Sequence, residues 1–268
     1  MAVSGGWVGS SAVDETGQRW ISAARSTLRL PAYGGWMSEM VGRSREDVIY
    51  VSGNDHNYNY IYLQNELLNR GTTPVKIIVQ GHLAAMNTGS PCFNFPAELQ
   101  NEYIHLYIQS NVMGRGGDGG GSTSHGGKNG GNAINNWIGG RLRIENVGAI
   151  CGGGGGGGDV GLGGNNATVA GGSGGRPLGL GGSYNYGGSG SKTNGNNASY
   201  DSPGARTSSV NYGTNQGGGG GEVGQPGEAG IASGADNQTR FPGGAPGMAV
   251  AGTTPTWINR GNIYGATV

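Results

Sequence analysis

The chain has 268 residues, of which 62 are glycine, and its 16 basic and 16 acidic residues give a formal net charge of zero. This balance leaves no basic or acidic tail for nucleic acid or charged lipid, and no apolar run reaches the roughly 18 residues of a membrane span. Glycine is unevenly distributed, with 11 residues before position 114 and 51 from there on, so we predict two domains, residues 1–113 and 114–268.

The first domain is predicted to be a small α+β unit. β-Branched and aromatic runs closed by turn residues predict strands at "DVIYVSG", "PVKIIVQG" and "EYIHLYIQSNV". The segment "YNYIYLQNELLNRG" predicts a short helix, because Tyr60, Leu63, Leu67 and Leu68 recur at helical spacing and Gly71 ends the pattern, with Pro74 beyond it. The start, "MAVSGGWVGSSAV", lacks a basic segment followed by an apolar one, so we expect synthesis in a cytoplasm without a signal peptide.

Three tryptophans fall within the first forty residues. They are Trp7, Trp20 and Trp36, and the last is followed directly by Met37. Two interpretations stay open at this point. The side chains pack in a core, or they form an apolar docking patch, because exposed Trp and Met are favoured at partner surfaces.

Glycine makes up 51 of the 155 residues of the second domain, too much for an ordinary apolar core. Collagen is excluded because "GGDGGGSTSHGGKNGG" breaks the required register of one glycine in three. A flexible linker is disfavoured because apolar motifs such as "AINNWIGGRLRIENVGAICGG" interrupt the glycine blocks. Ile108 and Ile144 each precede a Gly-Gly pair by eight residues, which suggests strand-like rungs that turn into glycine segments.

Ordering so much glycine requires compensation at nearly every residue. At about 1–2 kcal/mol each, fixing this domain costs on the order of 150–300 kcal/mol. Left-handed polyglycine type II helices packed side by side meet this cost, because their outward N–H and C=O groups satisfy one another. We therefore predict a domain of such packed helices. A fully surrounded helix must be almost pure glycine, which places at the centre the scaffold residues Gly152, Gly153, Gly154, Gly155, Gly156, Gly157 and Gly158.

Catalytic motifs in the chain are imitations produced by its composition. "GGSGG" around Ser173 matches a nucleophile elbow, but no helix former follows it. "GGSGSKT" fails the phosphate-loop pattern at both ends. Cys92 and Cys151 are too few for a disulfide framework or a zinc site and are interpreted as free thiols. The four histidines are scattered, so we predict no catalytic residue, no metal and no cofactor.

The longest stretch between glycine blocks, residues 183–216, has the composition of a binding loop. Ser, Tyr, Gly and Asn make up 23 of its 34 residues, as in antibody combining loops. The alternative is a merely flexible loop. Shorter inserts are "STSH", "DVGLGGNNATVA", "IASGADNQTRF" and "AGTTPTW", and we expect them to emerge at the ends of the glycine block, where several can form one recognition face.

Several motifs resemble one family across both halves: "MAVSGGWVGSSAV", "WMSEMVGRS", "IGGRLRIENVGAICGGGGGGG" and "GGRPLGLGG". They are similar to those of the tip adhesins of T-even-type bacteriophage long tail fibres. The resemblance implies an N-terminal domain docked on the distal end of the trimeric long tail fibre protein, with one adhesin per fibre at the virion's fibre tip. It also implies a polyglycine domain whose variable segments bind an outer-membrane protein of a Gram-negative enterobacterial host, a porin such as OmpC.

The residues and the resemblance together predict a receptor-binding adhesin that is not an enzyme and inserts into no lipid. Trp7, Trp20, Trp36 and Met37 are assigned to fibre docking. Aromatic and Arg side chains dominate interface energetics, so the predicted receptor-contact set is Tyr184, Tyr186, Tyr200, Arg206, Tyr212, Arg240 and Phe241. A tail-fibre assembly chaperone absent from the virion is the alternative. An ice-binding protein is disfavoured by the long Tyr/Asn insert.

Overall fold

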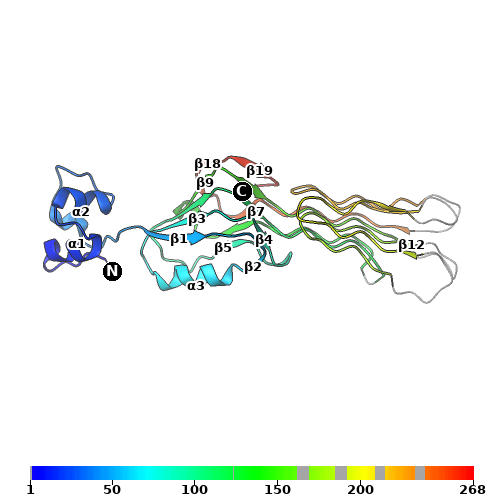
Figure 1. The fold of residues 1–268 in the computed structure, drawn as a ribbon, viewed down its shortest axis with the longest axis horizontal. Coiled ribbons are helices and arrows are strands. Elements are labelled where there is room, and N and C mark those ends of the chain that lie inside the picture. Colours follow the sequence, from blue (N-terminus) through cyan, green and yellow to red (C-terminus); the bar gives the residue numbers. More distant parts are fainter. Residues whose placement is uncertain (1, 123, 162–168, 185–191, 209–214, 233–238) are drawn as a thin grey trace.

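The protein is elongated, with three regions in a row along its long axis (Figure 1). The computed structural model describes residues 2–122, 124–161, 169–184, 192–208, 215–232 and 239–268. A small helical unit lies at one end, a sheet-rich region in the middle and a glycine-rich block at the other end. Within the described residues no helix has the length and apolar character needed to cross a membrane.

The helical unit is built from residues before position 42. It contains α1 (Val8–Thr16), α2 (Ile21–Thr27) and a short 3-10 helix, η1 (Met37–Met40). α1 ends at Gly17, whose left-handed backbone (φ 70°) closes the helix. A small separate core holds the unit together and contains Val3, Ala12, Ala24, Leu28 and Met40. The sequence analysis did not predict these helices, because they are short and begin without a side-chain cap.

The sheet-rich region is a parallel β-solenoid with three sheets. The first has the order β1 (Asp47–Val51), β3 (Val75–Val79), β6 (Ile104–Ile108), β9 (Leu142–Asn146), β18 (Thr256–Asn259). The second has the same rung order, with β2 (Asp55–Tyr58), β4 (Leu83–Ala85), β7 (Asn111–Met113), β10 (Ala149–Cys151), β19 (Asn262–Tyr264). The third contains β5 (Phe93–Phe95), β8 (Ile134–Asn136), β17 (Val250–Gly252), and all pairings in the three sheets are parallel.

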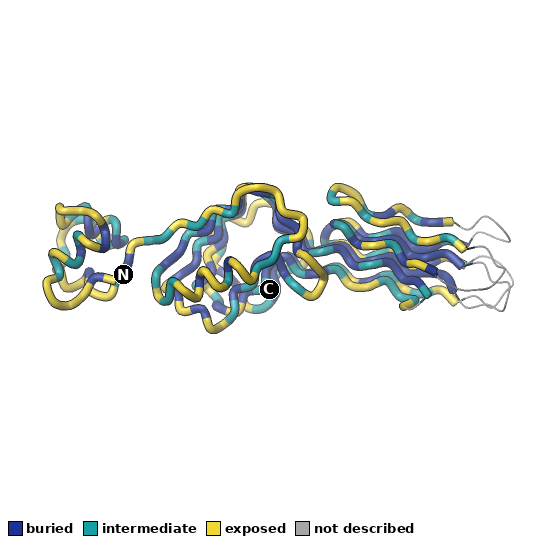
Figure 2. Tube along the Cα trace, turned by 60° about the horizontal axis from the view of Figure 1, so that its bottom comes forward, coloured by how far each residue is buried: buried dark blue, intermediate teal, exposed yellow. Residues whose placement is uncertain are grey.

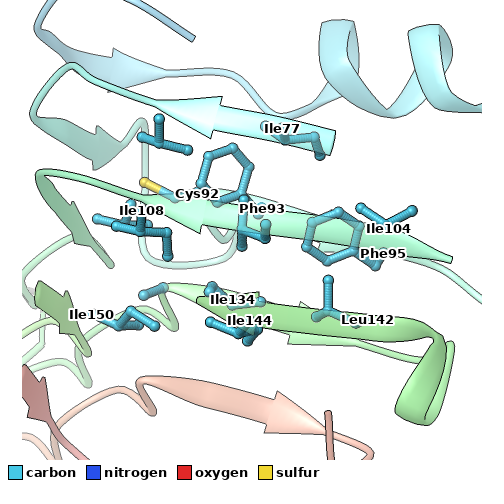
Figure 3. Packing of buried hydrophobic residues seen from close by; sticks show 14 of the residues in the cluster. Ile77, Cys92, Phe93, Phe95, Ile104, Ile108, Ile134, Leu142, Ile144 and Ile150 are labelled. Atoms are coloured by element: carbon cyan, nitrogen blue, oxygen red, sulfur yellow. The ribbon is translucent and has the colours of Figure 1, made fainter. Parts of the chain in front are cut away.

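One apolar core fills the solenoid (Figure 3). Ile77, Leu106 and Ile144 occupy one register level of the first sheet and are fully buried. Phe93 and Phe95 pack between the sheets from the third side. α3 (Ile61–Asn69) adds Leu63 and Leu67 to this core, so the predicted helix is confirmed, as are the predicted strands. "EYIHLYIQSNV" forms two strands, β6 and β7, which turn from one sheet into the next.

The rung interpretation is confirmed, but its predicted offset is wrong by two residues. Leu106 pairs with Ile144, and Ile108 pairs with Asn146. After β7 and after β10 the chain leaves the solenoid as a glycine segment and later returns to the third sheet. The sheets therefore combine strands from both sides of residue 113, and the predicted boundary runs through the solenoid because its later rungs lie beyond that residue.

The glycine-rich block, hereafter the lattice, consists of extended segments joined by backbone hydrogen bonds and is largely buried inside (Figure 2). Residues 152–158 are all buried. The segment that accepts the hydrogen bond from their N–H groups repeats every three residues. Gly153 and Gly156 donate to Gly131 and Lys128, and the groups between them donate to other segments. The segments that accept these bonds are residues 128–131, 173–176 and 225–228, with Tyr264 at one end.

The carbonyl groups of this central segment show the same repeat. Gly153 and Gly156 accept from Gly247 and Gly244, whereas Gly154 accepts from a different segment, at Gly117. The donating segments are residues 117–120, 218–224 and 244–247. Counting donors and acceptors, six described segments surround residues 152–158. A β-strand bonds in two directions, so the repeat of three is not that of a sheet.

Candidate functional site

The helical unit exposes its tryptophans. Trp7, Trp20 and Trp36 are 88%, 78% and 81% exposed, and Met37 is 40% exposed. Each tryptophan directly precedes a helix, at the N-cap position. Since the small core excludes all four side chains, core packing does not explain them. The unit therefore presents large apolar side chains at the end of the molecule opposite the lattice (Figure 1).

A buried arginine positions the last of these side chains. Arg25 donates hydrogen bonds to the carbonyl oxygens of Pro31 (2.7 Å) and Trp36 (2.8 Å) and to Glu39 Oε2 (2.8 Å). The hydrogen bond from Arg25 lowers the pKa of the exposed Glu39 carboxyl. Gly35 is required beside it, because a Cβ there would lie 1.9 Å from Arg25 Nη2. The segment carrying Trp36 and Met37 is thus fixed in place.

Trp7 also lines a polar cleft of about 600 Å³ between the helical unit and the solenoid. Ser10, Ser11 and Asp14 share the cleft wall with it, because the four residues lie on one face of α1. Arg45, Asp47 and Thr73 also line the cleft. This end of the molecule thus combines exposed aromatic rings with a polar recess.

At the far end of the lattice, short strands bring together the flanks of the four segments 162–168, 185–191, 209–214 and 233–238, which lie outside the described residues. One sheet has the order β13 (Lys192–Thr193), β12 (Val169–Ala170), β11 (Val160–Gly161), β16 (Thr239–Arg240). β14 (Thr207–Ser208) pairs with β15 (Gln216–Gly217), and Gln216 also bridges to Ile231. The described residues that flank these four segments therefore lie on one face, hereafter the far face.

Asp159 lies at this face, immediately after the central glycines, and is fully buried. Its Oδ2 accepts a hydrogen bond from the Tyr184 hydroxyl and lies 3.0 Å from His125 Nδ1. Burial raises the pKa of the Asp159 carboxyl, and the bonds to Tyr184 and His125 oppose that shift. Phe241 stacks on His125 with 4.5 Å between ring centroids. Tyr184 is buried, so its ring points into the lattice end rather than outward.

One residue of the predicted receptor-contact set, Tyr200, lies away from this face. Tyr200 stacks on His56, with ring centroids 4.0 Å apart, and packs against Met113 and Cys151 where the lattice meets the solenoid. Arg206, in contrast, directly precedes β14 at this face and donates to Glu228 Oε2 (2.7 Å). The Tyr200 ring therefore does not share a surface with the predicted contact residues at this face.

The physical reason is the course of residues 192–208. The sequence predicts one long insert over residues 183–216, but this middle part runs back along the lattice. Gly174 donates to Asn196 and accepts from Gly204, and the turn between them closes with a bond from Ser199 to Ser202. The Tyr200 ring is thus carried to the solenoid end.

The other predicted contact residues lie at the far face or outside the described residues. Arg240 is exposed and donates to the Ala232 carbonyl (2.9 Å), and Phe241 is half-buried beside it. Tyr186 and Tyr212 lie outside the described residues. The insert "AGTTPTW" belongs to the solenoid, since Thr253 donates to the Asn136 carbonyl (2.7 Å) in β8, so its predicted place at a recognition face is wrong.

The structure also places the residues that imitate catalytic motifs. Ser173 is buried and donates to the Ala205 carbonyl (2.6 Å), which leaves no free nucleophile. Cys92 and Cys151 are buried free thiols, and burial raises the pKa of Cys151 to about 12. In the part of the chain that the structure describes, no group of three or more metal-ligating side chains comes together. Sequence reasoning missed the partners of His125 and His56, because these lie far away in the chain.

An elongated molecule with exposed tryptophans at one end and the flanks of four chain segments gathered at the other has the organisation of a binding protein. Comparison with known proteins specifies the class. The family described as "Phage tail fibre adhesin Gp38" matches residues 46–268, and the family "Phage tail fibre adhesin Gp38 N-terminal domain" matches residues 1–41. The chain belongs to the Gp38 phage tail fibre adhesins, which are an adhesin family and not an enzyme family.

A curated relative and a solved structure agree with this assignment. The chain is 47% identical, over 266 residues and 99% of both chains, to the receptor-recognizing protein gp38 of Salmonella phage S16. It also matches the crystal structure of the gp37-gp38 adhesin tip complex of the bacteriophage S16 long tail fibre, with a TM-score of 0.80 and 46% identity over 100% of both chains. The fold described above is therefore the fold of that adhesin.

Proposed function

We propose that this chain is the receptor-recognising protein at the distal tip of a phage long tail fibre. One copy binds the distal end of the trimeric fibre protein through the helical unit, and the far face of the lattice binds an outer-membrane protein of a Gram-negative enterobacterial host. The observation that carries the proposal is the separation of two surfaces, with Trp7, Trp20, Trp36 and Met37 exposed at one end and four segment flanks gathered at the other. The gp37-gp38 tip complex of phage S16 supports the fibre partner.

The lattice segments are proposed to be packed polyglycine type II helices. Such a helix has three residues per turn and directs its N–H and C=O groups outward. The support is the strict repeat of three, in which Gly154 and Gly157 donate to one segment and Gly155 and Gly158 to another. An added Cβ would meet neighbouring backbone at every position from 152 to 158, which explains the pure glycine run.

A lattice of this kind suits an adhesin because it holds the flanks of the recognition segments in place. Less conformational entropy is then lost when the receptor binds. Binding is weakened when loops and side chains must be ordered on association. Six segments hold the central one, so the roots of the variable segments are fixed before the receptor arrives. We assign receptor contact to the undescribed segments, including Tyr186 and Tyr212, and to the exposed Arg240 beside them.

A porin such as OmpC is the proposed receptor class, and adsorption to single-porin deletion strains tests it. Phage should adsorb to a sensitive host and lose adsorption when one outer-membrane protein is deleted, with recovery when the gene is restored. The same particles should contain the chain after purification. Unchanged adsorption to every one of these deletion strains would contradict the assignment of a porin receptor. Absence of the chain from purified particles would favour the assembly chaperone instead.

A further inference from the structure

Four side chains from four separate stretches meet at the far face of the lattice. His125, Asp159, Tyr184 and Phe241 form this group, hereafter the anchor cluster. Asp159 precedes the undescribed segment 162–168, and Tyr184 directly precedes 185–191. Phe241 follows 233–238, and His125 lies two residues after the undescribed residue 123. Each member thus stands at the root of a different stretch.

The contacts within the cluster link separate stretches of the chain to one another and so act as an internal tie. One atom, Asp159 Oδ2, contacts both the Tyr184 hydroxyl and His125 Nδ1, so a single buried carboxyl joins three stretches. The stacked ring of Phe241 joins the fourth through His125. Asp159 follows Gly158 directly and accepts a backbone hydrogen bond from Phe241 at 3.1 Å. The tie is therefore rooted in the most enclosed segment of the lattice.

The group is not arranged as a receptor contact. Asp159 is fully buried and Tyr184 is buried, so the two hydrogen-bonding side chains at its centre offer almost no surface to a partner. A buried polar side chain that joins chain stretches acts on their relative placement. The exposed neighbour Arg240 has a different environment, with one bond to a backbone carbonyl.

We propose that the anchor cluster is a set of positioning residues for receptor recognition. It fixes the relative placement of the four chain stretches that carry its own members, and it determines affinity and host specificity without touching the receptor. This inference rests on the proposed function, since it concerns how the receptor-binding end is held. It assigns Tyr184 and Phe241 a supporting role in place of the receptor contact that the sequence analysis predicts for them.

A double-mutant cycle between Tyr184→Phe and Asp159→Asn tests the proposal. Each variant is measured for binding to outer-membrane vesicles from a sensitive host and for its thermal unfolding temperature. Each single change should weaken vesicle binding about tenfold, the loss expected for a hydrogen bond to a charged group. The double variant should lose less than the sum of the two single losses, because both changes weaken the same bond: Tyr184→Phe removes its donor and Asp159→Asn removes the charge of its acceptor. Binding to a distal fibre fragment should stay at the wild-type level.

The control is Tyr50→Phe, the same chemical change on an exposed tyrosine of β1 in the solenoid, which should bind vesicles like the wild type. Wild-type vesicle binding by Tyr184→Phe, or additive losses in the double variant, would overturn the proposal. So would a lower unfolding temperature with unchanged affinity. If Asp159→Asn does not fold, Tyr184→Phe and His125→Gln are compared as single variants, and each should weaken vesicle binding while leaving fibre binding unchanged. Failure of the wild-type protein to bind vesicles would instead refute the proposed function.

Discussion

Replacing Gly155 with alanine is expected to lower the unfolding temperature of the lattice by about 6–12 °C, and replacing it with valine should prevent lattice folding. A Cβ at this position would lie 1.9 Å from the Gly244 carbonyl oxygen and 2.8 Å from the Gly227 nitrogen. Both are backbone atoms in surrounding segments, so no side chain can rotate away. Overpacking costs about 3 kcal/mol at the upper end of the usual range, and each kcal/mol is worth about 2–4 °C here.

The matched control is Gly126→Ala, which makes the same change elsewhere in the lattice. A Cβ at Gly126 would have one neighbour, the Pro242 carbonyl oxygen at 3.7 Å, which is ordinary contact. Calorimetry should show a Gly126→Ala transition close to the wild type. Equal unfolding temperatures for Gly155→Ala and Gly126→Ala would mean that residues 152–158 are a tether. Soluble, infective particles carrying Gly155→Val would mean the same.

Changing Trp7, Trp20 and Trp36 together to alanine is expected to weaken binding to the distal fibre fragment at least about 100-fold. Large aromatic side chains at the centre of an interface contribute about 2 kcal/mol or more each when truncated. All three are exposed and outside the core of the helical unit, so the truncations should leave the unit folded. Co-purification and titration calorimetry with the fibre fragment measure the effect.

Trp137→Ala is the control for this experiment, because Trp137 is an exposed tryptophan in the sheet-rich region. It should bind the fibre fragment normally. The triple variant should keep its lattice unfolding temperature and its binding to host outer membranes, since those depend on the opposite end. Retained fibre binding by the triple variant would show that docking uses another surface.

Local pattern was enough for elements whose residues carry the signal themselves. β1, β3 and α3 follow from β-branched runs and from Leu63 and Leu67 at helical spacing. The shared spacing of Ile108 and Ile144 before a Gly-Gly pair indicated that rungs are present, but it did not give their register. Successive rungs are separated by different lengths of chain, and the strand pairing of Ile108 with Asn146 depends on the shared core rather than on sequence spacing.

The candidate site was harder to predict because its contacts join distant parts of the chain. Tyr composition marked residues 183–216 as a binding insert, but nothing local shows that residues 192–208 return along the lattice and carry Tyr200 to His56. The tie between Asp159 and Tyr184 spans 25 residues and that with His125 spans 34. One signal was present in the sequence: Asp159 is the charged residue that ends the central glycine run.

The central claim is that the far face of the lattice recognises the host receptor. Exchanging segments between phages tests this claim most directly. One chimera receives segments 162–168, 185–191, 209–214 and 233–238 from a relative with a different host, and a second receives only residues 196–204. The first should adsorb to the relative's host and lose the original one, while the second keeps the original host. A first chimera with the original host range, or a second with the relative's range, would contradict the account.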